Sequence, residues 1–154
     1  MKKLSFCTIV LSFIILGSCK NKAEETEKLV ETDAVISTEC YLAVYEKDTL
    51  DLTVTTLKSG KVSGNLEMRI FEKPSKNGKI EGEFSGDTLF ADYSFVEKVG
   101  GTTYKNPLAL LKKENRLILG NGQIQTTMGV SYLVKDVPID FDKVKYKFSV
   151  IDCK

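Results

Sequence analysis

The sequence predicts an all-β domain, in which an antiparallel meander of about eight to ten strands closes into a single small barrel. Three observations support this fold class. From Cys40 onward, apolar and polar residues alternate with a period of two, so that each strand has one buried and one wet face. Short turn signals separate these runs at the spacing typical of sandwiches and barrels. Cys40 and Cys153 bracket the alternating region.

The first 18 residues have the form of a secretory signal, with Lys2 and Lys3 followed by an apolar run and small residues. The apolar run is shorter than the roughly 20 residues that a membrane-spanning helix needs. The ending Leu16-Gly17-Ser18-Cys19 resembles the lipobox of bacterial lipoproteins. This resemblance implies removal of residues 1–18, a diacylglyceryl group on Cys19, and anchoring in the bacterial cell envelope. A transmembrane anchor and cleavage without lipidation are the alternatives.

The segment that follows, residues 19–38, is predicted to be a flexible tether. It is rich in glutamate and contains no glycine or aromatic residue, which favours a solvated chain. A short helix over Ala23–Val35 is an alternative. We expect the tether to connect an outer-membrane lipid anchor with the barrel domain, residues 39–154. Whether the domain lies on the periplasmic or the surface side is left open.

The barrel strands follow one another with short connections, so neighbours in sequence are expected to pair. The apolar face is clearest in the sets Leu50, Leu52 and Val54; Val62, Leu66, Met68 and Ile70; Ile80 and Phe84; Leu89, Tyr93 and Phe95; and Val144, Tyr146, Phe148 and Val150. The predicted strands cover residues 40–46, 49–57, 61–71, 78–85, 88–98, 102–112, 116–125, 130–135 and 144–152. Residues 136–143, with Pro138, form the longest connection.

A meander with one apolar face must bury that face, and closing into a barrel does so while removing both sheet edges. Closure pairs the first strand with the last. Because Cys40 opens the first strand and Cys153 ends the last, a disulfide between them is predicted; two unpaired thiols are the alternative. Gly64, Gly82 and Ala91 are in phase with the apolar face, which indicates either bent strands or space inside the barrel.

The pattern as a whole resembles the lipocalin-type calycins, and also small bacterial lipoproteins built from a lipobox, a tether and a β-meander. The first resemblance implies a lipocalin-like barrel. The Gly-x-Trp motif that opens lipocalins is absent, because the chain has no tryptophan. No lipocalin ligand is therefore carried over, and the likeness is one of architecture.

Composition excludes several kinds of chemistry. The chain has no histidine, which removes Ser-His-Asp and Cys-His catalysis and the commonest zinc ligand. With 22 basic and 21 acidic residues, no nucleic-acid partner is expected. Glu81 and Glu83 share the outward face of a strand and are expected to be solvated rather than to form a catalytic pair. Asp140 and Asp142 are expected to belong to a solvated loop rather than a calcium site. No metal or cofactor is predicted.

The function is predicted only in outline. Tyr93, Tyr132 and Tyr146 are in phase with apolar neighbours, so they either fill the core or hydrogen-bond a ligand inside a hollow barrel. The leading hypothesis is a non-catalytic, lipid-anchored envelope protein that binds a small apolar or amphipathic ligand in the barrel. An envelope scaffold or protein-interaction module with a filled barrel is the alternative, and an enzyme ranks third. A cavity of several hundred Å³ would favour a ligand; a filled interior with an exposed apolar patch would favour a protein partner.

Overall fold

The computed structural model describes residues 33–97 and 100–153. The predicted export signal, the lipidation site Cys19 and the tether up to residue 32 lie outside the described residues. Within the described ranges, every regular element is a β-strand. The part of the chain that the structure describes contains no helix that is long and apolar enough to cross a membrane.

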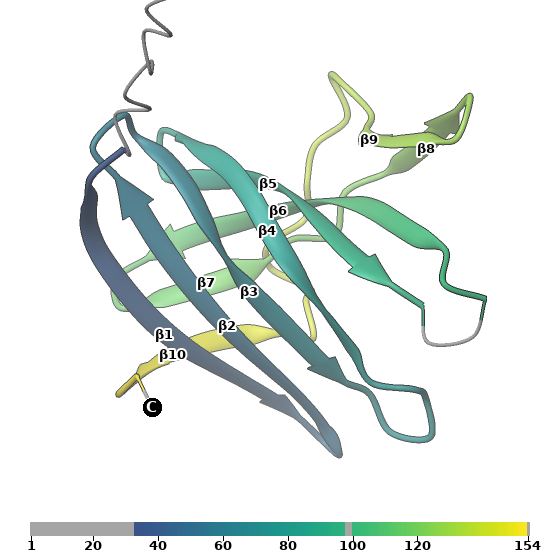
Figure 1. The fold of residues 1–154 in the computed structure, drawn as a ribbon, viewed down its shortest axis with the longest axis horizontal. Coiled ribbons are helices and arrows are strands. Elements are labelled where there is room, and N and C mark those ends of the chain that lie inside the picture. Colours follow the sequence, from purple (N-terminus) through teal and green to yellow (C-terminus); the bar gives the residue numbers. More distant parts are fainter. Residues whose placement is uncertain (1–32, 98–99, 154) are drawn as a thin grey trace, which may run out of the picture. The chain divides into compact units, whose positions relative to one another are not determined.

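Eight of the strands form a closed antiparallel barrel in the order β1-β2-β3-β4-β5-β6-β7-β10, with β10 beside β1 (Figure 1). The remaining two, β8 and β9, pair with each other as a hairpin inserted between β7 and β10. The bounds are β1 Val35–Tyr45, β2 Asp48–Leu57, β3 Lys61–Arg69, β4 Lys76–Ser85, β5 Thr88–Val96, β6 Thr103–Lys113, β7 Arg116–Leu119, β8 Ile124–Thr127, β9 Val130–Leu133 and β10 Lys147–Ile151. The predicted meander and its closure are confirmed.

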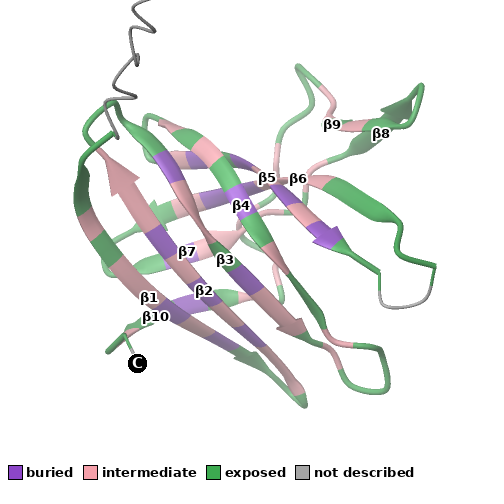
Figure 2. Ribbon diagram, viewed as in Figure 1, coloured by how far each residue is buried: buried purple, intermediate pink, exposed green. Residues whose placement is uncertain are grey.

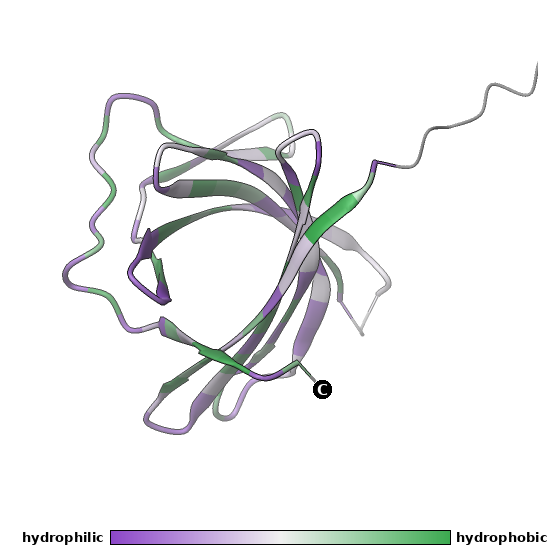
Figure 3. Ribbon diagram, turned by 90° about the vertical axis from the view of Figure 1, so that its left-hand side faces the viewer, coloured by the Kyte–Doolittle hydropathy of each residue, from purple (hydrophilic) through white to green (hydrophobic). Residues whose placement is uncertain are grey.

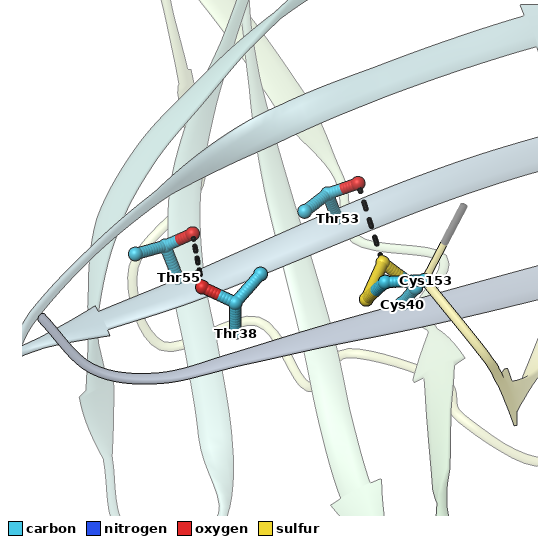
Figure 4. Close-up of a disulfide and its surroundings, with 5 residues drawn as sticks. All are labelled: Thr38, Cys40, Thr53, Thr55 and Cys153. Carbon is cyan, nitrogen blue, oxygen red and sulfur yellow. Dashed lines mark hydrogen bonds between the residues drawn. A yellow bond between two sulfur atoms is a disulfide. The ribbon is translucent and has the colours of Figure 1, made fainter.

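The predicted disulfide closes the barrel where its first and last strands meet. In the β1–β10 register Cys40 lies opposite Ile151, two residues before Cys153. The two cysteines are bonded, with their Cα atoms 5.2 Å apart. Figure 4 shows the bond beside Thr53 of β2, next to the hydrogen-bonded pair Thr38 and Thr55. These side chains lie on the face opposite the buried Tyr41, so the covalent link is on the outer wall.

Buried and exposed residues alternate along the barrel strands (Figure 2), as the period-two pattern predicts. Figure 3 shows the barrel strands arranged in a ring around one centre. A single cluster of buried side chains occupies that centre, and its largest fully buried members are Tyr93, Phe148, Leu50, Leu66, Ile80, Leu89, Leu110 and Leu117. A packed cluster of side chains therefore occupies the centre of the barrel.

The inward glycines mark bends rather than internal space. A Cβ atom at Gly64 would overlap the carbonyl oxygen of Thr53 on the neighbouring strand. A Cβ atom at Gly82 would likewise overlap the backbone oxygen of Phe90. Adjacent backbones approach so closely here that only glycine fits, which allows the strands to curve around a narrow barrel.

The predicted strand 116–125 is wrong as a single element. It divides into β7 and β8 because the chain turns away from the barrel at Gly120. A Cβ atom there would overlap the side chains of Ile139 and Phe141, which pack against this point from the later connection. The predicted strand 130–135 corresponds to β9, which pairs only with β8 and is not a barrel strand.

The two ends of the barrel chain also differ from the prediction. β1 begins at Val35, which lies opposite Leu57, so residues 35–38 belong to the first strand and not to the tether. The last strand begins at Lys147, because the preceding residues form a turn. In that turn a carboxylate oxygen of Asp140 accepts hydrogen bonds from the N–H groups of Asp142 and Lys143.

Candidate functional site

The structure separates the three tyrosines that were candidates for ligand binding. Tyr93 is buried in the interior and stacks on Phe95, with ring centroids 5.1 Å apart. Tyr146 packs against the edge of the core. Tyr132 lies on β9, outside the barrel, with 41% of its surface exposed. The expectation that Tyr132 shares the interior is wrong, because β9 is not a strand of the barrel.

Two of these hydroxyl groups have contrasting environments. Burial raises the pKa of Tyr93 to about 12, and its hydroxyl has no hydrogen-bond partner among the described residues. The hydroxyl of Tyr146 donates to Asp48 at 2.7 Å. Burial, together with this contact, raises the pKa of Tyr146 to about 12. The backbone N–H of Phe71, and secondarily Tyr146, lower the pKa of Asp48. Tyr146 thus links the core edge to Asp48 through its hydroxyl, whereas the Tyr93 hydroxyl makes no such link in the described chain.

Charged and aromatic side chains cover the two barrel ends. At the end where β1 meets β2, lysine ammonium groups lie over aromatic rings, at 4.0 Å for Lys47 over Phe71 and 4.7 Å for Lys76 over Phe95. At the other end an ion pair of 3.6 Å joins Lys112 to Glu39 beside the buried Tyr41. Together with the core, these contacts help to separate the barrel interior from solvent.

A groove of about 590 Å³ lies on the outside of the barrel, between the β4–β5–β6 wall and β9. Figure 1 shows the β8–β9 hairpin projecting beside β6. The groove is lined by Lys61, Glu81, Gly82, Glu83, Phe90, Ala91, Asp92, Pro107, Leu108, Ser131, Tyr132 and Leu133. It is the candidate functional site, because its volume suits a small ligand or a short stretch of peptide.

The barrel wall of this groove carries an unusual arrangement of charge. Glu81 lies directly opposite Asp92 in the β4–β5 register, although like charges facing each other weaken a sheet. Lys105 relieves part of this repulsion through an ion pair of 2.8 Å with Asp92, which raises the lysine pKa. Glu83 lies opposite Phe90 on one strand and Lys61 on the other. Within the described residues no ion pair involves Glu81 or Glu83.

Small residues and aromatic rings shape the space between the two walls. Gly82 and Ala91, which face inward and lie opposite each other in the register, also line the groove. Phe90 on the barrel wall is 40% exposed, and Tyr132 on β9 is 41% exposed. The groove therefore combines aromatic surface with carboxylates that have no ion-pair partner on the described chain.

The hairpin that forms the second wall has no charge of its own. Every residue from Leu117 to Val134 is uncharged, although 28% of the whole chain is charged. All four residues of β8 are exposed, and Met128 at the hairpin tip is 100% exposed. In the described chain β9 forms a ladder only with β8, so its other edge is unpaired. Unpaired edges are usually protected by charge or bulges, and β9 has neither.

The structure also places the carboxylates that the sequence offered as possible catalytic or metal-binding residues. Glu81 and Glu83 are exposed on the outer face, as predicted, but they border the groove. The N–H groups of Lys143 and Asp142 lower the pKa of Asp140, which caps a turn. Over residues 33–97 and 100–153, no three histidine, cysteine, aspartate or glutamate side chains are placed to hold a metal ion.

Comparisons of this chain with known protein families, with curated proteins and with solved structures give no match. The groove itself is therefore the main guide to function. Sequence reasoning missed the groove because it treated residues 130–135 as barrel wall. The signal that points to it is the long uncharged run from Leu117 to Val134, within a densely charged chain.

Proposed function

We propose that this chain is a lipid-anchored cell-envelope protein that acts by binding, without catalysis, and that its partner binds on the outside of the barrel. One observation carries the proposal: packed side chains occupy the interior, while the groove of about 590 Å³ lies on the outer wall. The barrel then serves as a rigid support for a binding surface. Cys19 and the tether supply the attachment to the membrane.

This choice favours the interaction module over a small ligand held in the barrel. A ligand at the centre would have to displace fully buried side chains such as Leu66, Ile80 and Tyr93. Protein interiors are close-packed, so emptying such a site costs several kcal/mol for each large residue displaced. The absence of histidine and the solvent-exposed positions of Glu81 and Glu83 support a non-catalytic role.

The location of binding is tested with an apolar, anionic probe, 1-anilinonaphthalene-8-sulfonate, and the full chain in a non-ionic detergent. We expect no saturable change in the amide NMR signals of interior residues such as Leu66 and Tyr93. One-to-one binding that shifts those interior signals would show that the barrel opens, and would overturn the proposal.

The use of the outer surface is tested in cells with a photo-reactive phenylalanine analogue. One variant carries it at Phe90 in the groove, and a matched control carries it at Val44, which is 62% exposed on β1. We expect one cross-linked species of defined mass from position 90 and none from position 44. Equal cross-linking from both positions would contradict a dedicated outer binding surface.

The membrane attachment has its own test. Two or more acyl chains anchor a protein stably, whereas one gives only marginal binding. We therefore expect Cys19→Ser to move the protein from the membrane pellet into the soluble fraction, as measured by immunoblotting after a high-salt wash. Retention of the variant in the pellet would show that lipid on Cys19 is not the anchor.

A further inference from the structure

We infer that the outer groove binds an extended segment of a partner protein, which adds as a strand to the free edge of β9 and places a basic side chain between Glu81 and Glu83. The inference depends on the proposed function, because it names the class of partner for the same groove. Three features of the described residues carry it: a strand edge, a charge pattern and a pair of exposed rings.

The first feature is the edge of β9. Three consecutive residues of this strand, Ser131, Tyr132 and Leu133, line the groove. Consecutive side chains of a strand point to opposite faces, so a set of three neighbours presents backbone as well as side chains. That backbone has no ladder partner on the groove side in the described chain. An extended peptide can use such an edge through main-chain hydrogen bonds, which is the strand-addition mode of recognition.

The second feature is the charge on the opposite wall. Glu81 faces Asp92, and Lys105, which also interacts electrostatically with Glu81, forms its ion pair on the described chain with Asp92 alone. The opposition of these carboxylates costs stability that a cation in the groove would return. Glu83 is also without an ion pair there, although Lys61 lies opposite it in the register. A cationic side chain thus complements this wall, whereas an acidic one is repelled.

The third feature is the pair of aromatic rings at Phe90 and Tyr132. One lies on the barrel wall and the other on β9, each about two-fifths exposed. A planar guanidinium group can bind carboxylates through paired hydrogen bonds and can also stack on aromatic faces. Arginine therefore suits this groove better than lysine. In an extended partner segment, the apolar residues that alternate with arginine would contact the rings of Phe90 and Tyr132 and the side chain of Leu133.

The same chemistry argues against other occupants. The chain's own tether mixes Lys20, Lys22 and Lys28 with Glu24, Glu25, Glu27 and Glu31, so it has no net positive charge for the carboxylates of the groove to attract. The hairpin of a second copy is uncharged and would leave Glu81 and Glu83 without a partner. A small inorganic cation would make no use of the β9 edge. A basic, extended segment of a different protein satisfies all three features.

The test uses the full chain in non-ionic detergent and two fluorescent, end-capped seven-residue peptides. One alternates valine with arginine, and the other replaces each arginine with glutamate. We expect saturable binding of the arginine peptide by fluorescence anisotropy, with NMR shifts at Phe90 and residues 131–133. We expect no binding of the glutamate peptide. Equal binding of both peptides, or binding of neither, would overturn the inference.

Charge-neutral variants locate the contact. The double variant Glu81→Gln with Glu83→Gln is expected to weaken arginine-peptide binding at least tenfold. A matched control, Glu97→Gln with Glu114→Gln, removes the same charge from exposed positions away from the groove and is expected to change binding less than twofold. Exposed substitutions of this kind have little effect on stability, so both variants should remain folded. An equal loss in both variants would show nonspecific charge attraction.

Strand addition has a separate readout. An arginine peptide with N-methyl groups on alternate backbone nitrogens retains its charge but cannot donate hydrogen bonds along one edge. We expect one of the two N-methylated registers to lose binding and the other to retain it. If both bind like the parent peptide, strand addition is wrong. Loss of peptide discrimination alongside persistent cross-linking from position 90 would overturn this inference and leave the proposed function standing. Ligand entry into the barrel would instead overturn the proposed function, and the inference with it.

Discussion

In the barrel, each strand has a hydrogen-bonded partner on both sides and buries alternate side chains, whereas the β8–β9 hairpin has a single ladder and buries almost none of its own. The barrel strands carry charges on their outer faces, while the hairpin carries none. Different physical constraints therefore act on the two sequences. The barrel sequence supplies apolar residues to a core and polar residues to a surface that contacts water. The hairpin sequence has neither a core nor a charged surface, which is typical of a surface that another molecule covers.

Removal of the disulfide is expected to have the largest effect, and it affects the barrel alone. The cysteines are 113 residues apart. In the loop-entropy model a loop of roughly 100 residues gives about 4.7 kcal/mol, and removal of a native disulfide typically costs about 2–5 kcal/mol. We expect Cys153→Ala to lower the free energy of unfolding by an amount in this range, as measured by urea denaturation. Reducing agent should then have no further effect; an unchanged midpoint in reduced wild-type protein would contradict this.

A cavity in the core is expected to have the next largest effect. Leu66 is 1% exposed and belongs to the interior cluster. We expect Leu66→Ala to cost about 3 kcal/mol of stability, from lost burial and from the cavity left behind. The matched hairpin variant, Ile124→Ala, should cost less than about 0.5 kcal/mol, because this side chain is half exposed. Similar losses from both variants would remove the distinction between the two regions.

A smaller effect, of opposite sign, is expected at Tyr93. Its buried hydroxyl has no partner among the described residues, so Tyr93→Phe should raise stability by about 1 kcal/mol. The control is Tyr146→Phe, which loses a hydrogen bond to Asp48 and should lower stability. The pKa of Asp48 is depressed on folding, so its contribution is present at neutral pH and is lost as pH falls through the folded pKa. The Tyr146→Phe difference should therefore shrink in acid. A loss of stability in Tyr93→Phe would indicate that the hydroxyl has a bound partner.

The smallest effect on stability is expected at the hairpin tip. Met128 is fully exposed and Ile124 is 51% exposed. We expect the double substitution Ile124→Lys with Met128→Lys to change the free energy of unfolding by less than about 0.5 kcal/mol. Thermal unfolding by circular dichroism provides the measurement. A large loss would show that the hairpin contributes to the stability of the barrel.

The barrel could be predicted from the sequence because the alternation of buried and exposed side chains along its strands is periodic. Apolar residues alternate with polar ones at Leu50, Leu52 and Val54, and this pattern predicts a half-buried strand. Closure followed from Cys40 and Cys153, whose positions correspond to neighbouring strand ends. The glycines were ambiguous, since bending and internal space both require small residues. Only the close approach of Gly64 to the Thr53 backbone decides between them.

The candidate site could not be predicted, because the departure of the β8–β9 hairpin from the barrel leaves no periodic pattern in the sequence. Tyr132 alternates with its neighbours in β9 as it would in a barrel strand, and alternation does not reveal which partner a strand has. The departure of the chain at Gly120 depends on Ile139 and Phe141, which are distant in sequence. The face-to-face position of Glu81 and Asp92 depends on the register, which composition does not define.

The position of β10 has a consequence for how the protein is made. β10 is synthesised after all the other barrel strands, so β1 lacks one neighbour until β10 emerges, about 6–23 s after Cys40 at roughly 5–20 residues per second. During that interval the edges of β1 and β7 are open, and open edges invite pairing with other chains. The barrel cannot close before its final strand arrives, and until then both edges need to be shielded from other chains.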